Sequence, residues 1–250
     1  MYRNTVGIAE RCVEICAIFP QSLSLCKPYR VERTADFSIQ TSFREIDAER
    51  GVLIAKKLID KPSDALIESA ILLRKLADGM IDYDAFLMHG AVVAVNGNAY
   101  MFAAKSGVGK TTHIYKWLEN VPYAYVVNGD KPLIISDGEP RVCGTPWCGK
   151  ERMGCNEIVP LKAIVIMDRS DDNHIEQISF TEAFPRLLEQ THRPNDADKM
   201  RKTVRLLAGL ATSVKFYRFN VNNFKEDAFE TSYKMLIRPT DSICSGCNRQ

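Results

Sequence analysis

A glycine-rich segment at residues 104–112, Ala-Lys-Ser-Gly-Val-Gly-Lys-Thr-Thr, constrains the fold more than any other part of the chain. An apolar run at residues 100–103 precedes it, and a helical pattern at residues 113–119 follows it. A strand that passes through a glycine turn into a helix is typical of a phosphate-binding loop, because the turn amides and the positive end of the helix face the same anion. The sequence therefore predicts a nucleotide site at this turn.

The residues expected to contact the nucleotide belong to this loop and to the first turn of the helix: Ser106, Gly107, Val108, Gly109, Lys110, Thr111 and Thr112. Lys110 is expected to reach the β and γ phosphates, and the Thr111 hydroxyl is expected to ligate Mg²⁺. Ala104 stands where a first glycine is common, but that glycine does not wrap the phosphates, so the prediction is kept.

Charge and hydropathy exclude several other classes of protein. The 33 basic and 31 acidic residues nearly cancel, which gives no electrostatic reason to expect binding to nucleic acid or to a membrane surface. No apolar run approaches the ~20 residues that cross a bilayer. The first residues lack the apolar core of a signal peptide, so we expect a cytoplasmic protein.

The eight cysteines are expected to be reduced thiols, because a cytoplasmic protein rarely carries a disulfide framework. Cys244 and Cys247 form a CxxC pair, but no second pair completes a tetrahedral zinc set. Cys12 and Cys16 are expected to be packing residues.

Three regions are predicted along the chain. Residues 1–84 are expected to form a mainly β region with strands at 12–19, 37–43 and 51–58 and one helix, which opens at Pro62-Ser63-Asp64 and stops near Gly79. Residues 85–237 are expected to form the nucleotide-binding domain, and residues 238–250 a tail.

An Asn-Gly turn at residues 96–98 separates apolar runs at 91–95 and 99–103, which predicts a hairpin. The strand before the glycine loop should thus pair antiparallel with its predecessor, unlike the parallel neighbours of a doubly wound fold. Further strands are expected at 123–127, 133–135, 141–143, 161–167 and 214–219, and helices at 181–190, 197–211 and 225–237. The fold class predicted is α/β with a mixed, partly antiparallel sheet.

Two residues outside the loop are candidates for the chemistry. Asp130 closes the predicted strand 123–127, where a carboxylate that ligates the metal of a phosphoryl-transfer site is expected; the alternative is a turn-forming Gly-Asp pair. His89 precedes the hairpin and could reach a γ-phosphate, although a lone histidine is more often a structural residue.

Several blocks in a fixed order then resemble a known group. They are Met88-His89-Gly90-Ala91, the Asn-Gly hairpin, the glycine loop, Val127-Asn128-Gly129-Asp130-Lys131-Pro132, and the segment Gly144-Thr145-Pro146-Trp147-Cys148-Gly149-Lys150. Over about residues 85–235 the chain resembles the catalytic domain of HPr kinase/phosphorylase and related proteins of the HPr-kinase and PEP-carboxykinase-like superfamily.

The resemblance implies a P-loop kinase that transfers the γ-phosphoryl group of ATP, with Mg²⁺, to a hydroxyl of a small metabolite or of a serine in a peptide or protein. It implies that His89, Asp130 and Lys110 are catalytic and that His89 lies near the transferred phosphate. Thr111 and Asp130 would hold the metal, and either His89 or Asp130 would act on the acceptor hydroxyl. HPr kinases form rings, which leaves open a homo-oligomer.

The chain departs from the family at one position. The family has two adjacent aspartates where this chain has Gly129 and Asp130. If Gly129 marks a lost carboxylate, the variant Gly129→Asp is expected to raise turnover. The loop at residues 144–150 is either a ligand loop or a rigid turn with Trp147 packed inward, and Arg193 is either a charge stabiliser or an exposed helix-end residue.

Three functions follow, in this order. The first is an ATP-dependent kinase with a hydroxyl-bearing acceptor. The second is a nucleotide-binding regulator that has lost efficient transfer, and the third is an ATP-dependent carboxykinase, which would need more metal ligands than the sequence offers.

Overall fold

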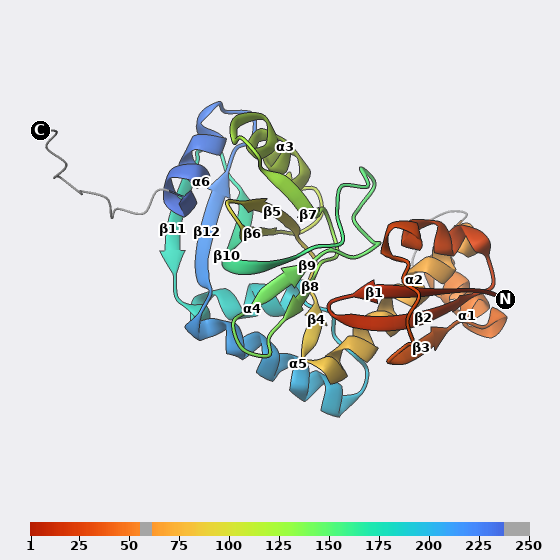
Figure 1. Cartoon of the computed structure of the whole chain (residues 1–250). Helices are drawn as coiled ribbons and strands as arrows, with labels where there is room; N and C mark the ends of the chain where they lie inside the picture. The colour runs from red at the N-terminus through yellow and green to blue at the C-terminus, as the bar shows by residue number, and fades with distance from the viewer. Residues whose placement is uncertain (56–61, 238–250) are drawn as a thin grey trace, which may run out of the picture.

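The computed structural model describes residues 1–55 and 62–237. The protein is an α/β structure with two mixed sheets, one of three strands near the N-terminus and one of nine strands (Figure 1). The α/β class and the mixed sheet are confirmed. Among the described residues, no helix is long and apolar enough to cross a bilayer. Cys244 and Cys247 lie outside the described residues, as does the predicted tail.

The three-stranded sheet contains β1 (Tyr2–Ile8), β2 (Arg11–Ala17) and β3 (Phe37–Gln40). β1 and β2 are antiparallel, and β2 and β3 are parallel. Ala9 and Glu10 both have positive φ, at 49° and 64°, as a two-residue hairpin with the right-handed strand twist requires. The strand predicted at 12–19 is confirmed with both ends shifted toward the N-terminus, and the one predicted at 37–43 is confirmed but ends at Gln40. β1 was not predicted.

The strand predicted at residues 51–58 is wrong over its described part, because residues 51–55 belong to the helix α1 (Phe43–Ala55). Ser42 and Glu45 form a capping box before this helix: the Ser42 amide donates to Glu45 Oε2 at 2.9 Å, and the Glu45 amide donates to Ser42 Oγ at 3.3 Å. The apolar run at 52–54 continues the helix that this box begins.

The predicted helix at Pro62–Gly79 is α2 (Asp64–Met80), whose N-cap Ser63 accepts a hydrogen bond from the Leu66 amide. Glu68 of α2 is fully buried and joins the helix to the N-terminal strands. Its carboxylate accepts hydrogen bonds from the amides of Ile18 and Phe19 at 2.6 and 2.9 Å. A buried carboxylate is tolerated here because backbone donors satisfy it.

Seven strands of the large sheet lie in the order β4-β8-β9-β10-β6-β5-β7. β12 pairs with β10, and β11 pairs with β12. Their bounds are β4 (Ala85–Leu87), β5 (Ala91–Val95), β6 (Asn98–Ala103), β7 (Tyr125–Asn128), β8 (Leu133–Ile135), β9 (Arg141–Cys143), β10 (Ile158–Arg169), β11 (His174–Ile178) and β12 (Lys215–Val221). The predicted hairpin is confirmed as the antiparallel pair β5–β6, with Val95 opposite Asn98.

The helices that cover this sheet are α3 (Lys110–Asn120), α4 (Phe180–Gln190), α5 (Ala197–Gly209) and α6 (Asp227–Ile237). The described chain also has three 3₁₀ segments: η1 (Pro20–Tyr29), η2 (Ile81–Tyr83) and η3 (Leu210–Thr212). Side chains of α4 and α5 share one core with alternate residues of β6, such as Met101. Side chains of α3 and α6 share another with Phe102 on the opposite face. The sheet is therefore covered on both faces (Figure 1).

Candidate functional site

The glycine loop (residues 104–109) connects the end of β6 to the start of α3, as predicted. Gly107 and Gly109 have φ of 83° and 110°, a region that L side chains rarely adopt. Gly109 is the N-cap residue of α3 and provides no capping side chain. The first amides of α3 therefore lack a side-chain acceptor at the cap and face outward at the positive end of the helix, where an anion is favoured.

Lys110 is the first residue of α3, and its side chain folds back over the loop. Its Nζ donates a hydrogen bond to the Ala104 carbonyl at 2.9 Å. Burial lowers the pKa of Lys110, and the positive charge of Lys131 lowers it further. The negative charge of Asp130 raises this pKa in part. The Lys110 ammonium group is thus close enough to Asp130 and Lys131 for their charges to affect its pKa.

Asp130, Lys131 and His89 form a cluster beside the loop. Asp130 Oδ1 lies 2.9 Å from Lys131 Nζ and 3.1 Å from His89 Nε2. Burial alone would raise the pKa of Asp130, but the hydrogen bonds and charges of His89 and Lys131 lower it to about 2. Asp130 is therefore a carboxylate at neutral pH, and Oδ2 makes no hydrogen bond to any residue in 1–55 or 62–237.

The sheet topology explains why three residues distant in sequence meet here. β5 pairs antiparallel with both β6 and β7, with Ala91 opposite Phe102 and Val92 opposite Asn128. The start of β5 and the ends of β6 and β7 therefore lie at one edge of the sheet. His89 precedes β5, the glycine loop follows β6, and Asp130 follows β7. The structure therefore brings these three predicted elements together.

Two backbone contacts hold His89 in place. Its amide donates to the Gln190 carbonyl at 2.7 Å, and the next amide, of Gly90, donates to the Asp130 carbonyl at 3.0 Å. The Nδ1 atom of His89 lies 3.1 Å from Gln190 Oε1. Gln190 ends α4 and was missed, since nothing in the sequence links it to His89.

Asn128 shapes the turn that presents Asp130. It is fully buried, and its Oδ1 accepts hydrogen bonds from the amides of Asp130 and Lys131 at 2.8 and 2.7 Å. Its Nδ2 donates to the Thr145 carbonyl at 3.1 Å. The Asn-Gly-Asp sequence is typical of such a side-chain-to-backbone turn, so this role was readable from the sequence.

Gly129 has a packing role that the sequence did not reveal. A Cβ at this position would lie 2.7 Å from the Cys148 carbonyl oxygen and 3.2 Å from that of Met153. The Gly129 amide also donates to the Met153 carbonyl at 2.9 Å. An aspartate therefore needs residues 148–153 to move, and the expectation that Gly129→Asp raises turnover requires a rearranged loop.

Replacing Gly129 with alanine is expected to destabilise the protein by about 2 kcal/mol, because the new methyl group meets backbone rather than a flexible side chain. Urea unfolding measures the difference. The control is Gly51→Ala in α1, where a Cβ meets nothing within 4 Å; it should leave stability unchanged or raise it by up to about 1 kcal/mol. Equal stabilities of the two variants would contradict the packing role.

The loop at residues 144–150 packs inward at Trp147. This side chain is 9% exposed, and its Nε1 donates to the Ser69 carbonyl of α2 at 3.1 Å. A Cβ on Gly144 would lie 1.8 Å from the Cys155 carbonyl oxygen. These contacts support the rigid turn for Gly144 and Trp147, while Lys150 is exposed.

Asp168 was not predicted as a site residue, although it follows the apolar run at 161–167. β10 runs parallel to β6 with Ile166 opposite Ala103, so Asp168 lies beside the start of the glycine loop. Its carboxylate pairs with Arg186 of α4, and both line a small cavity together with Gln190. An ion pair thus flanks the loop on the side of His89.

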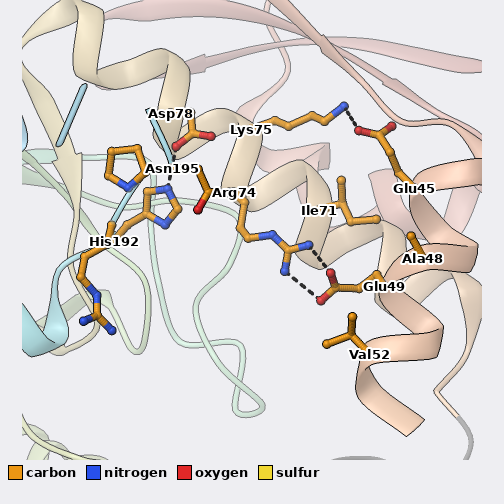
Figure 2. A pocket seen from close by; sticks show the side chains of 12 residues that line it. Glu45, Ala48, Glu49, Val52, Ile71, Arg74, Lys75, Asp78, His192 and Asn195 are labelled. Atoms are coloured by element: carbon orange, nitrogen blue, oxygen red, sulfur yellow. Dashed lines mark hydrogen bonds and ion pairs between the residues drawn. The ribbon is translucent and has the colours of Figure 1, made fainter. Parts of the chain in front are cut away.

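A separate cleft of about 410 Å³ lies between α1, α2 and residues 192–195 (Figure 2). Polar side chains in this cleft pair with one another: Arg74 with Glu49 at 2.8 Å, Lys75 with Glu45 at 2.6 Å and His192 with Asp78 at 2.7 Å. Arg193 lines it and is exposed, which places that residue in this cleft rather than in the His89–Asp130 cluster.

Metal binding by protein groups alone has little support. Among residues 1–55 and 62–237, no group of three or more His, Cys, Asp or Glu side chains could hold an ion. The described cysteines are free thiols. Mg²⁺ at a nucleotide site needs less, because phosphate oxygens and water complete its shell around one or two protein ligands. Among the described residues Asp130 Oδ2 makes no hydrogen bond, and Thr111 is the second residue of α3, directly after Lys110.

Comparison with known proteins gives no family for this chain: no family model matches it, and no curated protein is similar to it.

Proposed function

We propose that the protein is an ATP-dependent P-loop phosphotransferase of the HPr-kinase-like kind, which transfers the γ-phosphoryl group to a hydroxyl. The observation that carries the proposal is the meeting of the glycine loop, Asp130 and His89 at one edge of the sheet. A phosphate loop alone indicates a nucleotide, whereas a carboxylate and a histidine beside it provide groups for the metal and the acceptor.

The roles of the binding residues follow from their positions. The loop amides and the Lys110 ammonium would hold the β and γ phosphates, since Lys110 Nζ needs only to leave the Ala104 carbonyl to reach them. Thr111 and Asp130 Oδ2 would hold Mg²⁺, whose charge would offset that of the phosphates. Lys131, which neutralises Asp130, would bring a second positive charge to the same place.

Asp130 is better suited to the metal than to proton abstraction. A carboxylate whose pKa is about 2 is a weak base, and an effective general base has a pKa nearer the working pH. His89 is the residue in the cluster whose type suits proton transfer near neutral pH. We therefore assign the metal to Asp130 and the acceptor hydroxyl to His89, whose Nε2 would exchange Asp130 Oδ1 for that hydroxyl.

Replacing His89 with alanine is expected to lower the rate of ATP hydrolysis or transfer by about 10²-fold, the usual cost of losing a positioned acid or base. Phosphate release from Mg²⁺–ATP measures it, and ATP affinity should change little because the loop is intact. The matched control is the exposed His174→Ala on β11. Unchanged turnover in His89→Ala would remove His89 from the reaction and leave it a structural role.

The second candidate is a nucleotide-binding regulator without efficient transfer. It is favoured by the weak basicity of Asp130 and by the loop that fills the space beside Gly129. A regulator would bind Mg²⁺–ATP and change its conformation or partner without producing ADP. The carboxykinase alternative gains no support, because the described residues offer no additional metal cluster.

A further inference from the structure

A second cavity, of about 620 Å³, lies against the other side of the glycine loop. Gly107, Gly109 and Thr112 form one wall. The ends of β10 and β12 and the turns that follow them form the other, including Arg169 and Phe224. Neither His89 nor Asp130 lines it. The cavity therefore adjoins the proposed phosphate site without belonging to the His89–Asp130 cluster.

Phe224 stands at this cavity with its ring in solvent, at 99% exposure. Its backbone is held, because its amide donates to Asn222 Oδ1 at 3.0 Å and the Asn222 amide donates to Asn173 Oδ1 at 2.7 Å. A phenyl ring on an ordered turn keeps an uncovered apolar face beside a cavity. Such a face is suited to stacking against a planar aromatic ligand.

A buried hydrogen-bond chain fixes this turn to the glycine loop. Trp117 Nε1 can only donate, and it lies 3.2 Å from His113 Nε2, so this nitrogen accepts. His113 Nδ1 then carries the proton and donates to Asn223 Oδ1 at 3.1 Å. Asn223 Nδ2 in turn donates to the Gly109 carbonyl at 3.1 Å. The turn that carries Phe224 is thereby positioned relative to the loop.

Burial keeps this chain in one protonation state. It lowers the pKa of His113 to about 4, against a smaller opposing effect of the bond to Asn223. The ring is neutral at physiological pH, so the donor and acceptor directions in the chain do not change there.

The His89–Asp130 cluster and the cavity with Phe224 lie on different sides of the glycine loop. His89 precedes β5 and Asp130 follows β7, and both strands lie on one flank of β6, where the proposed function puts the terminal phosphate and the acceptor. The cavity lies on the other flank of β6, at the ends of β10 and β12. Thr112, two residues after Lys110 in the same helix turn, lines the second cavity. A triphosphate bound along the loop with its γ end at Lys110 would direct its nucleoside toward this cavity. Arg169 adds a guanidinium there, since its Nη2 donates to the Gly107 carbonyl.

We propose that this cavity receives the base and ribose of a nucleoside triphosphate, with the base stacked on Phe224; this inference rests on the phosphate site proposed above. It makes Phe224 a binding residue for the nucleoside and Asn223 a positioning residue. It also predicts that the nucleoside contributes to affinity independently of the phosphates.

The test compares two ligands, Mg²⁺–ATP and Mg²⁺–tripolyphosphate, on the full chain by calorimetry. Phe224→Ala should weaken ATP binding by about tenfold and leave tripolyphosphate binding unchanged, because stacking involves only the base. Phe224→Trp should retain ATP binding. The matched control is Tyr123→Ala, which removes an aromatic ring that is 95% exposed but does not line the cavity. Lys110→Ala should weaken both ligands.

Two results would overturn the inference, and they differ. If wild type binds both ligands and Phe224→Ala binds ATP as wild type does, the base lies elsewhere and the phosphate site stands. If wild type binds neither ligand, the phosphate site itself is wrong and the nucleoside cavity falls with it. Thermal melting without ligand shows whether Phe224→Ala is folded, and an exposed ring should cost little stability.

Discussion

Asp130→Asn is expected to lower the rate of metal-dependent phosphoryl transfer by about 10³-fold or more, because one metal ligand accounts for several kcal/mol of the barrier. Asparagine keeps the size of the side chain and removes the charge that Lys131 now balances. The rate of ADP formation at saturating Mg²⁺–ATP measures the loss. ATP affinity should fall much less, since the loop amides and Lys110 remain.

The control for this variant is Asp198→Asn on α5, which also removes a carboxylate with a cationic partner, here Arg201, but at an exposed site. Its rate should equal that of wild type. The low pKa of Asp130 adds a second expectation: it stays ionised from about pH 5 to about pH 9, so wild type should show no titration of this group in that range. An Asp130→Asn protein that is folded and fully active would exclude the metal role.

Lys110→Ala is expected to weaken Mg²⁺–ATP binding at least tenfold. The lost ammonium supplies a point charge to the β and γ phosphates, and the backbone of the loop cannot replace it. Lys110 Nζ makes one described hydrogen bond, to the Ala104 carbonyl, so its removal should not unfold the chain. The increase in melting temperature on adding Mg²⁺–ATP, compared with wild type, measures the effect.

Lys162→Ala provides the control, because this lysine on β10 is exposed and pairs only with Glu139 among the described residues. It should be stabilised by Mg²⁺–ATP as much as wild type is. If Lys110→Ala were stabilised equally as well, the glycine loop would not be the nucleotide site, and the roles assigned to Thr111 and Asp130 would have no basis.

The sequence predicted the parts of the fold that depend on short-range signals. The Asn96-Gly97 turn requires positive φ at both residues and has it, at 50° and 74°, so the β5–β6 hairpin and its antiparallel pairing were predictable. The helices predicted to begin at Pro62-Ser63-Asp64 and at residue 197 begin where they were expected, with Ser63 and Asp196 as their N-caps. These features depend on neighbours within a few residues.

The errors have local causes as well. The strand predicted at 51–58 was read from a short apolar run, which cannot by itself distinguish a strand from a buried helix turn. The Ser42-x-x-Glu45 capping box is the local signal that identifies α1. β11 was not predicted because His174–Ile178 mixes polar and apolar residues. In the described structure it is an edge strand that pairs with β12.

The site was predictable only in part. The glycine loop, His89 and Asp130 carry recognisable residue patterns. Gln190 meets His89 and Arg186 meets Asp168 through the position of α4, and Phe224 comes beside the glycine loop through the turn after β12. Their positions depend on pairings between strands far apart in sequence, which no local pattern encodes. The packing constraint on Gly129 is likewise invisible without the approach of residues 148–153.

The central claim is that phosphoryl transfer occurs at the edge where the loop, Asp130 and His89 meet. The most direct measurement incubates the protein and a cell extract with ATP labelled at its γ-phosphate and compares wild type with Asp130→Asn. The account predicts a labelled product with wild type that is nearly absent with Asp130→Asn. Equal labelling by the two proteins would contradict the assignment of Asp130, and no labelled product with wild type, despite tight ATP binding, would favour the regulator instead.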